Sequence, residues 1–317
     1  GKCTIWPVSS RSEISCCAAF SSCSEVILAT TIVEPRGLSR PGQRLASGRS
    51  ENLMIHSDFP VPEHPWSEDS SHSCMEGTTE SRIAISDGGI LCDGNVDFEW
   101  ETDAFTVDYW RDRGRLQEAA VGGRGTVVFL QHGDDEWALR HYQRGGLFGR
   151  LFEDHYLWTG EANTRSFREW RLLNLLYGLG LPVPRPIAAS YVRWRGSYCA
   201  DLITRRIPGA EPLSSRLARA TLPRERWADI GRCIRRFHDA GVWHADLTAH
   251  NLLVDRDDAP WLLDFDKGRI RSGDRWRQAN LDRFLRSLRK VSRERPGLHI
   301  APADWEALVA AYRQIPA

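Results

Sequence analysis

The segments HADLTAHNLLVD, residues 244–255, and WLLDFDKG, residues 261–268, hold the most informative pattern in this chain. In the first, three polar residues follow the spacing H-x-D-x-x-x-x-N and precede the apolar run LLV. In the second, the apolar run WLL ends at Asp264. Short apolar runs bounded by turn residues are typical of buried strands. The pattern therefore predicts a loop and a hairpin that bring Asp246, Asn251 and Asp264 together.

The chemistry of these side chains indicates phosphoryl transfer. The Asn251 amide and the Asp264 carboxylate are oxygen ligands of the kind that Mg²⁺ prefers. Asp246 is then free to orient an acceptor hydroxyl and to accept its proton. We expect His244 to brace the loop rather than to act as an acid or base. Phosphoryl transfer depends mostly on positioning and charge neutralisation, which this small set of residues can supply.

These two segments resemble the protein-kinase-like superfamily. Its motif H-R-D-L-x-x-x-N matches HADLTAHN, and its D-F-G matches DFD. The resemblance implies an α+β, bilobal fold: an N-lobe of antiparallel sheet with one main helix, and a mostly helical C-lobe. Ala245 departs from the arginine of the motif, and Asp266 departs from its glycine. The second departure leaves the conformation of the chain after Asp264 open.

A glycine-rich segment, GGRGTVVFL, begins at Gly122. Gly122, Gly123 and Gly125 can let backbone N–H groups approach the phosphates of a nucleotide. A plain hairpin turn explains the same glycines equally well.

The next segment, EWALRHY at residues 136–142, alternates like a strand. Arg140 falls where the superfamily carries a phosphate-binding lysine, so we expect it to bind the nucleotide phosphates. A surface arginine is the alternative. Lys267, in the segment after Asp264, is a further candidate for phosphate binding.

A helix is expected over residues 164–177, where apolar residues recur at intervals of three. Glu169 lies on this helix and is the expected partner of Arg140. Glu153 and Glu161, in the preceding loop, are competitors for that role.

Six segments together narrow the resemblance: WALRHYQRGGLFGRL, TRSFREWRLL, GLPVPRPIAA, ADLITRRIPGA, FHDAGVWHADLTAHNLL and WLLDFDKGRIR. They are similar to the 3-deoxy-D-manno-octulosonic acid (Kdo) kinases of Gram-negative bacteria, relatives of the lipopolysaccharide heptose kinases, over about residues 83–315. The resemblance implies that ATP phosphorylates the 4-hydroxyl of the Kdo sugar of a lipid A precursor. It also implies a peripheral protein on the cytoplasmic face of the inner membrane.

Charge and hydropathy bear on the partners. The 317 residues carry 42 basic and 42 acidic side chains. This balance gives no indication of nucleic-acid binding, so we expect no nucleic acid as a partner. We also expect no protein partner. No apolar run approaches the ~20 residues that span a bilayer. Residues 267–295 are rich in arginine, and their apolar residues have helical spacing. A cationic amphipathic helix suits anionic lipid, although a solvated arginine face is an equal alternative.

The N-terminal part of the chain has a different composition. Residues 1–74 are rich in serine and cysteine and show no useful periodicity, so we expect a disordered or non-native extension. We place the N-lobe with its leader at residues 75–207 and the C-lobe at 208–317.

Three other functions remain open. A heptose kinase differs in its acceptor, and an aminoglycoside-type phosphotransferase would act on a small soluble acceptor. A pseudokinase that only binds partners is the non-enzyme alternative, although intact Asp246, Asn251 and Asp264 favour an enzyme.

Overall fold

The part of the chain that carries the predicted motifs is well covered by the computed structural model, which describes residues 77–122, 125–143, 154–295, 298 and 300–314. The extension predicted at residues 1–74 lies outside these ranges. That hypothesis, and the division of the lobes at residue 207, stay predictions.

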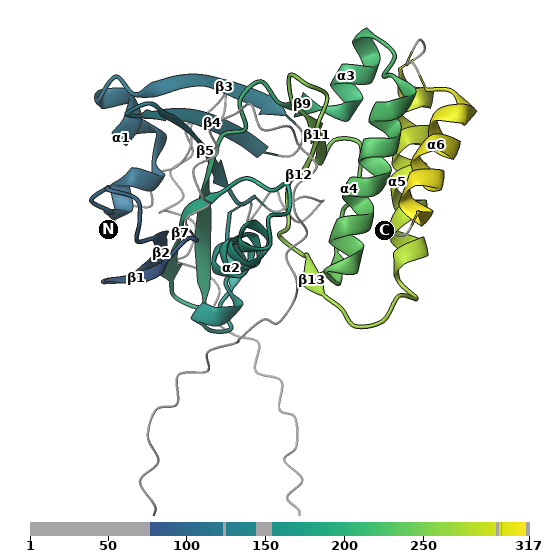
Figure 1. The fold of residues 1–317 in the computed structure, drawn as a ribbon. Helices are drawn as coiled ribbons and strands as arrows, with labels where there is room; N and C mark the ends of the chain where they lie inside the picture. The colour runs from purple at the N-terminus through teal and green to yellow at the C-terminus, as the bar shows by residue number, and fades with distance from the viewer. Residues whose placement is uncertain (1–76, 123–124, 144–153, 296–297, 299, 315–317) are drawn as a thin grey trace, which may run out of the picture. The chain divides into compact units, whose positions relative to one another are not determined.

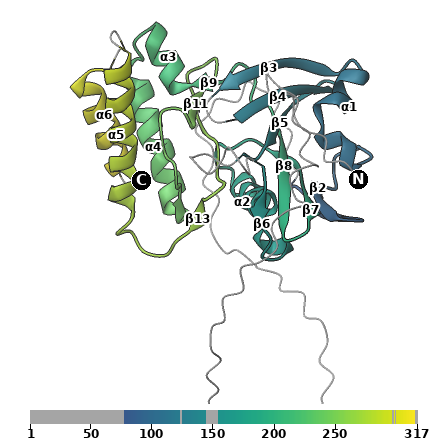
Figure 2. The same cartoon turned by 180° about the vertical axis from the view of Figure 1, so that it is seen from behind.

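Antiparallel strands form the first half of the described chain (Figure 1). They are β1 (Glu80–Ile85), β2 (Gly88–Asp93), β3 (Leu116–Gly122), β4 (Gly125–His132), β5 (Asp135–His141), β6 (Tyr156–Leu157), β7 (Pro186–Trp194) and β8 (Ser197–Arg205). They make one eight-stranded sheet in the order β1-β2-β7-β8-β5-β4-β3, and β6 pairs with β8 (Figure 2). The register pairs Arg140 of β5 with Leu202 of β8. The strand predicted over residues 136–142 is confirmed as β5.

An aromatic cluster packs at the outer part of this sheet. The short helices η1 (Thr102–Phe105) and α1 (Val107–Asp112) follow β2 in the chain. Trp110 of α1 is fully buried beside Trp137 of β5, and Phe98 stacks on Trp110 with ring centroids 5.7 Å apart. Large aromatic rings bury much apolar area each, so this cluster stabilises β5, the strand that carries Arg140.

The main helix of this half is α2 (Arg165–Gly178), which follows η3 (Glu161–Asn163) and packs against β7. Its apolar stripe of Phe167, Trp170, Leu173 and Leu176 is buried. The helix predicted over residues 164–177 is thus confirmed to within one residue. Because Glu169 lies between Phe167 and Trp170, the same stripe carries its carboxylate into the interior.

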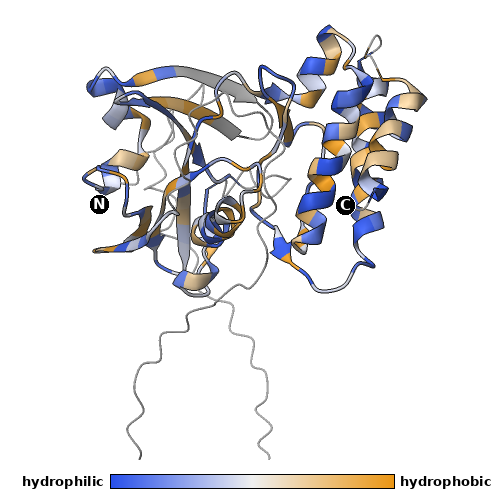
Figure 3. Cartoon of the chain, in the orientation of Figure 1, coloured by the Kyte–Doolittle hydropathy of each residue, from blue (hydrophilic) through white to orange (hydrophobic). Residues whose placement is uncertain are grey.

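Helices dominate the second half: α3 (Leu213–Arg219), α4 (Arg224–Asp239), α5 (Arg277–Glu294) and α6 (Pro302–Arg313). Polar and apolar residues alternate along them, as expected for helices that bury one face (Figure 3). Helices α4 and α6 approach closely at Gly231, where an added Cβ would lie 2.2 Å from the backbone oxygen of Leu308. Only glycine allows this contact, which explains its presence inside a helix.

Two small sheets hold the segments of the catalytic motif. Their strands are β9 (Glu211–Pro212), β10 (Val242–Trp243), β11 (Leu252–Val254), β12 (Pro260–Leu262) and β13 (Arg269–Ile270). Strand β11 pairs with β12 and β9, and β10 pairs with β13. The predicted hairpin is confirmed. Its second strand ends at Leu262, and Leu263 continues the same register by donating its N–H to the Asn251 carbonyl.

A single hydrophobic cluster contains residues of both halves. Phe167 and Trp170 of α2 share it with Phe237 of α4 and with Phe265, which follows the catalytic hairpin. The antiparallel sheet, its one long helix and the helical second half agree with the predicted α+β fold. Among the described residues, no helix is both long enough and apolar enough to span a membrane.

Candidate active site

The loop between β10 and β11 is held by His244. This side chain is buried, and its Nε2 donates to the Leu263 carbonyl at 2.8 Å. Its Nδ1 accepts the N–H of Asp246 at 3.1 Å. Burial lowers the pKa of His244, so the ring stays neutral and these two bonds fix its tautomer. The geometry is that of a brace between the loop and the end of the hairpin.

Asp246 and Asn251 face each other across this loop. The Asn251 amide nitrogen donates to the Asp246 carbonyl at 2.9 Å and to the Asp246 Oδ2 at 3.3 Å. Because the nitrogen is engaged, the amide oxygen is the atom that Asn251 can offer to a cation. The backbone bond from Leu263 to Asn251 places Asp264 next to this pair.

Arg140 joins the sheet to the catalytic hairpin. Its guanidinium donates to Asp264 Oδ1 at 2.8 Å, to the Tyr142 hydroxyl at 3.1 Å, and to the Glu169 carboxylate. Glu169 also accepts the N–H of Phe265 at 3.0 Å. The structure therefore brings together Arg140, Glu169 and Asp264, three residues selected from the sequence, and pairs Arg140 with Glu169 as expected.

The electrostatics of this network follow from its burial. Burial would raise the pKa of Asp264, but the Arg140 guanidinium outweighs it and holds that pKa below its usual range. Asp264 is thus ionised, as a metal ligand must be. For Glu169, burial raises the pKa and the Arg140 guanidinium opposes the rise. A charged pair of this kind depends on both partners because little water is present to replace either one.

Two competitors for Glu169 fall outside this network. Glu161 forms an ion pair with Arg82 at 2.7 Å and accepts the Tyr191 hydroxyl at 2.6 Å. Glu153 lies outside the described residues.

Sequence reasoning missed Tyr142. Its hydroxyl donates to Glu169 and completes the surroundings of that carboxylate. A signal was present, because residues two apart in a strand share a face, and Tyr142 follows Arg140 by two.

The segment after Asp264 is tied to α2. Asp266 forms an ion pair with Arg165, the first residue of α2. Asp266 lies within a turn that the Gly268 N–H closes on the Phe265 carbonyl at 2.8 Å. The departure from the superfamily glycine therefore has a structural consequence: a carboxylate anchors this segment to the main helix.

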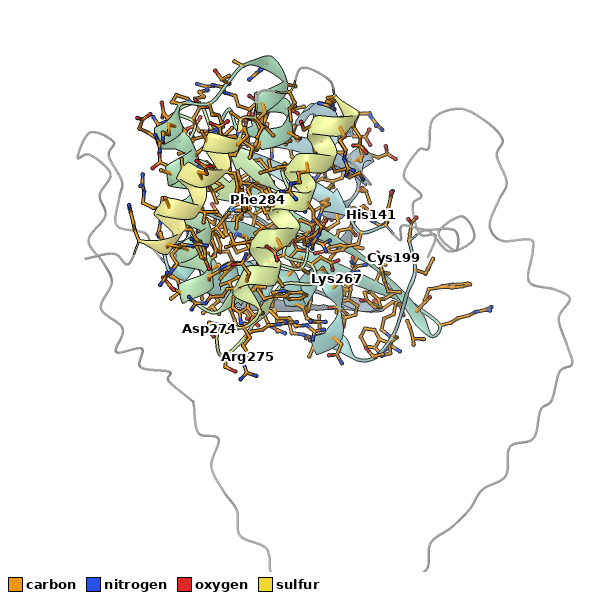
Figure 4. The ribbon with its side chains drawn as sticks, turned by 90° about the vertical axis from the view of Figure 1, so that its right-hand side faces the viewer. His141, Cys199, Lys267, Asp274, Arg275 and Phe284 are labelled. Atoms are coloured by element: carbon orange, nitrogen blue, oxygen red, sulfur yellow. The ribbon has the colours of Figure 1, made fainter. Side chains whose placement is uncertain are left out.

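The remaining predicted residues lie around this centre. Gly122 and Gly125 pair at the ends of β3 and β4, which agrees with the hairpin alternative, while Gly123 lies outside the described residues. Lys267, labelled in Figure 4, follows Asp266 in the same turn. Its side chain is exposed.

The donor set suits magnesium. Within the described residues no group of three or more His, Cys, Asp or Glu side chains gathers as a metal site. Mg²⁺ bound together with a nucleotide takes one or two protein oxygens, and its other ligands come from phosphates and water. The Asn251 amide oxygen and the ionised Asp264 carboxylate fit that requirement.

An antiparallel lobe with a buried Arg–Glu pair, joined to a catalytic loop with aspartate and asparagine, defines a protein-kinase-like phosphotransferase. The family model described as "Lipopolysaccharide kinase (Kdo/WaaP) family" matches residues 107–312. The chain belongs to this family and is a kinase that acts on a hydroxyl group.

Individual relatives agree. The chain is 42% identical over 227 residues to a 3-deoxy-D-manno-octulosonic acid kinase of Haemophilus influenzae strain PittGG, covering 68% of this chain and 92% of that protein. It is 42% identical over 229 residues to the protein of the same name from Actinobacillus succinogenes, covering 68% and 95%. A crystal structure of WbdD has a TM-score of 0.38 and 17% identity over 62% of this chain and 45% of that one.

Proposed function

We propose that this chain phosphorylates the 4-hydroxyl of the Kdo sugar of a lipid A precursor, with ATP as the donor. The reaction type rests on the network in which Arg140 contacts both Glu169 and Asp264. The acceptor rests on the relatives, which are named for Kdo and are matched over nearly their whole length.

Each residue has a defined task in this reaction. Arg140 holds the α- and β-phosphates, and Glu169 fixes the orientation of its guanidinium. Asn251 and Asp264 hold Mg²⁺, which neutralises phosphate charge when bound. Asp246 orients the acceptor hydroxyl toward the γ-phosphate and accepts its proton.

Two further phosphate contacts belong to the proposal. The glycines at 122, 123 and 125 let backbone N–H groups approach the phosphates. Lys267, whose side chain is exposed in the same turn as Asp266, supplies a cation.

We also propose a peripheral position on the cytoplasmic side of the inner membrane. Helix α5 buries Leu281, Phe284 and Leu288 and exposes arginines on its remaining surface. Basic side chains near an anionic leaflet each favour binding. Flotation with vesicles of anionic or neutral lipid tests this proposal, and equal binding to both would contradict it.

The central experiment is a transfer assay with γ-labelled ATP, Mg²⁺ and Kdo-bearing lipid A precursor in detergent. Asp246→Asn and Asp264→Asn should abolish labelling of the Kdo sugar. Asp257→Asn, in an exposed turn near β11, is the matched control and should retain it. Label on a heptose acceptor but not on Kdo would identify a heptose kinase. Label on a soluble aminoglycoside alone would identify a small-molecule phosphotransferase, and absence of nucleotide binding would identify a pseudokinase.

A further inference from the structure

Helix α5 is fastened to the catalytic loop at two points. The Asn280 amide nitrogen donates to the His244 carbonyl at 2.7 Å. About two helical turns further along, the Ser287 hydroxyl accepts the N–H of Ala249 at 3.1 Å. Phe284, labelled in Figure 4, is fully buried between these points. The backbone of α5 is therefore fixed relative to the loop that carries Asp246.

Arg283 lies between the two fastening points. It is three residues after Asn280 and four before Ser287, so all three side chains share one face of the helix. Its Nη2 donates to Asp246 Oδ1 at 2.5 Å. The Arg283 side chain is 45% exposed and the Asp246 side chain 51% exposed. Ion pairs this open to water contribute little to stability and exchange readily.

The ion pair occupies the carboxylate that the reaction needs. Asp246 Oδ2 faces the Asn251 amide, and Oδ1 is held by Arg283. An acceptor hydroxyl that donates to Asp246 must take a place beside these groups. When the hydroxyl displaces Arg283 from Oδ1, a guanidinium is left next to the acceptor without its carboxylate. An acceptor that brings its own carboxylate satisfies that guanidinium, because the planar fork of arginine matches a carboxylate in two parallel hydrogen bonds.

We propose that Arg283 binds the carboxylate of the acceptor sugar. This inference rests on the proposed function, in which the acceptor is an octulosonic acid. On binding, the Arg283–Asp246 pair is exchanged for two contacts with the substrate: the hydroxyl donates to Asp246, and the carboxylate accepts from Arg283. The fixed position of α5 sets the spacing between them and so selects which hydroxyl is presented to the γ-phosphate.

The exchange also provides selectivity between sugars. A neutral sugar such as a heptose would leave Arg283 without a carboxylate partner once Asp246 has taken the hydroxyl. A carboxylate acceptor gains a charge-assisted, bidentate contact with Arg283 that a neutral sugar cannot make. Arg283 therefore favours an ulosonic acid over a neutral acceptor.

The test compares two acceptors and three enzymes. The acceptors are the Kdo-bearing lipid A precursor and the same molecule with the Kdo carboxylate converted to a carboxamide. The enzymes are the wild type, Arg283→Gln and the control Arg232→Gln. Arg232 lies on α4, is about as exposed as Arg283, and forms an ion pair with Asp229 at 2.6 Å. We measure kcat and KM for each acceptor, and KM for ATP.

Wild-type enzyme should prefer the carboxylate acceptor by about 10- to 100-fold in kcat/KM, the range expected for hydrogen bonds to a charged group. In Arg283→Gln this preference should disappear, with KM for ATP unchanged, whereas Arg232→Gln should behave as wild type. If Arg283→Gln lowered kcat/KM by the same factor for both acceptors, the inference would be overturned. Arg283 would then act only through Asp246 or on another anion. Wild-type transfer without a preference would overturn it too, while leaving the proposed function standing. No wild-type transfer to the carboxylate acceptor would overturn both.

Discussion

The buried carboxylate of Glu169 supports the most direct test of the site. Glu169→Gln keeps the size of the side chain and can still accept the N–H of Phe265, but it removes the negative charge beside Arg140. The Glu169 side chain is 2% exposed, so water cannot replace the lost charge. Breaking a buried ion pair costs about 3–5 kcal/mol. Arg140 keeps Asp264 as a partner, so we expect the lower end, about 3 kcal/mol.

This loss should be visible in thermal unfolding. For a domain of this size, 1 kcal/mol lowers the midpoint by about 2–4 °C, so Glu169→Gln should unfold about 6–12 °C below the wild type. The KM for ATP should also rise, because Arg140 loses the group that orients it.

Glu80→Gln is the matched control. Glu80 pairs with Arg171 of α2 at 2.8 Å, and its side chain is 40% exposed. Exposed pairs contribute about 0–1 kcal/mol, so this variant should unfold within about 4 °C of the wild type. If both variants shifted the midpoint equally, the reasoning would be refuted, and Glu169 would have to carry a proton in the folded protein.

Three other predictions concern stability. Asp266→Asn should lower the free energy of unfolding by about 1–3 kcal/mol, because it leaves the Arg165 guanidinium without its carboxylate. Combining it with Arg165→Gln should cost less than the sum of the two single changes in a thermal double-mutant cycle, and strictly additive effects would contradict the ion pair. Burial lowers the pKa of His238 from 6.5 to about 4, so the unfolded chain binds more protons between these values and stability falls as the pH drops through them. Urea unfolding gives the free energy of unfolding at pH 7 and at pH 5. Between these pH values it should fall by about 2 kcal/mol more in the wild type than in His238→Gln, and an equal fall in both would disprove the assignment. Gly231→Ala should destabilise by about 1–3 kcal/mol, because its Cβ would meet the backbone of α6, whereas Gly178→Ala, with open space around it, should be neutral or stabilising. Similar unfolding midpoints for these two variants would contradict the close approach.

Local patterns predicted the elements that position the site. The apolar stripe of α2 and the short runs around the catalytic loop each have one strong periodicity, so they could be assigned without tertiary information. Motif spacing then selected Asp246, Asn251 and Asp264, and strand position selected Arg140.

Contacts between distant segments were not predictable in the same way. Asp266 and Arg165 are separated by 101 residues, and Arg283 and Asp246 by 37. In a chain with 42 basic side chains, nothing local distinguishes the arginine that reaches a given carboxylate. Glu161 shows the same difficulty, since the sequence allowed it to compete for Arg140 while the fold places it on Arg82. Such pairings depend on how the elements pack, which sequence periodicity does not specify.

The proposed contact of Arg140 with the nucleotide phosphates has a consequence for chemical labelling. Burial disfavours the charge of Arg140, but Glu169, Tyr142 and Asp264 outweigh it and raise its pKa, so the guanidinium stays protonated and is not nucleophilic. Acyl-phosphate derivatives of ATP, which modify the amine of a lysine in the nucleotide site, have no such amine at this position. Of the two lysines that the structure describes, Lys267 and Lys290, the first lies three residues from Asp264. Nucleotide-dependent acylation of this kinase should therefore fall on Lys267, and the modified peptide would report how far the bound triphosphate extends toward the turn after Asp266.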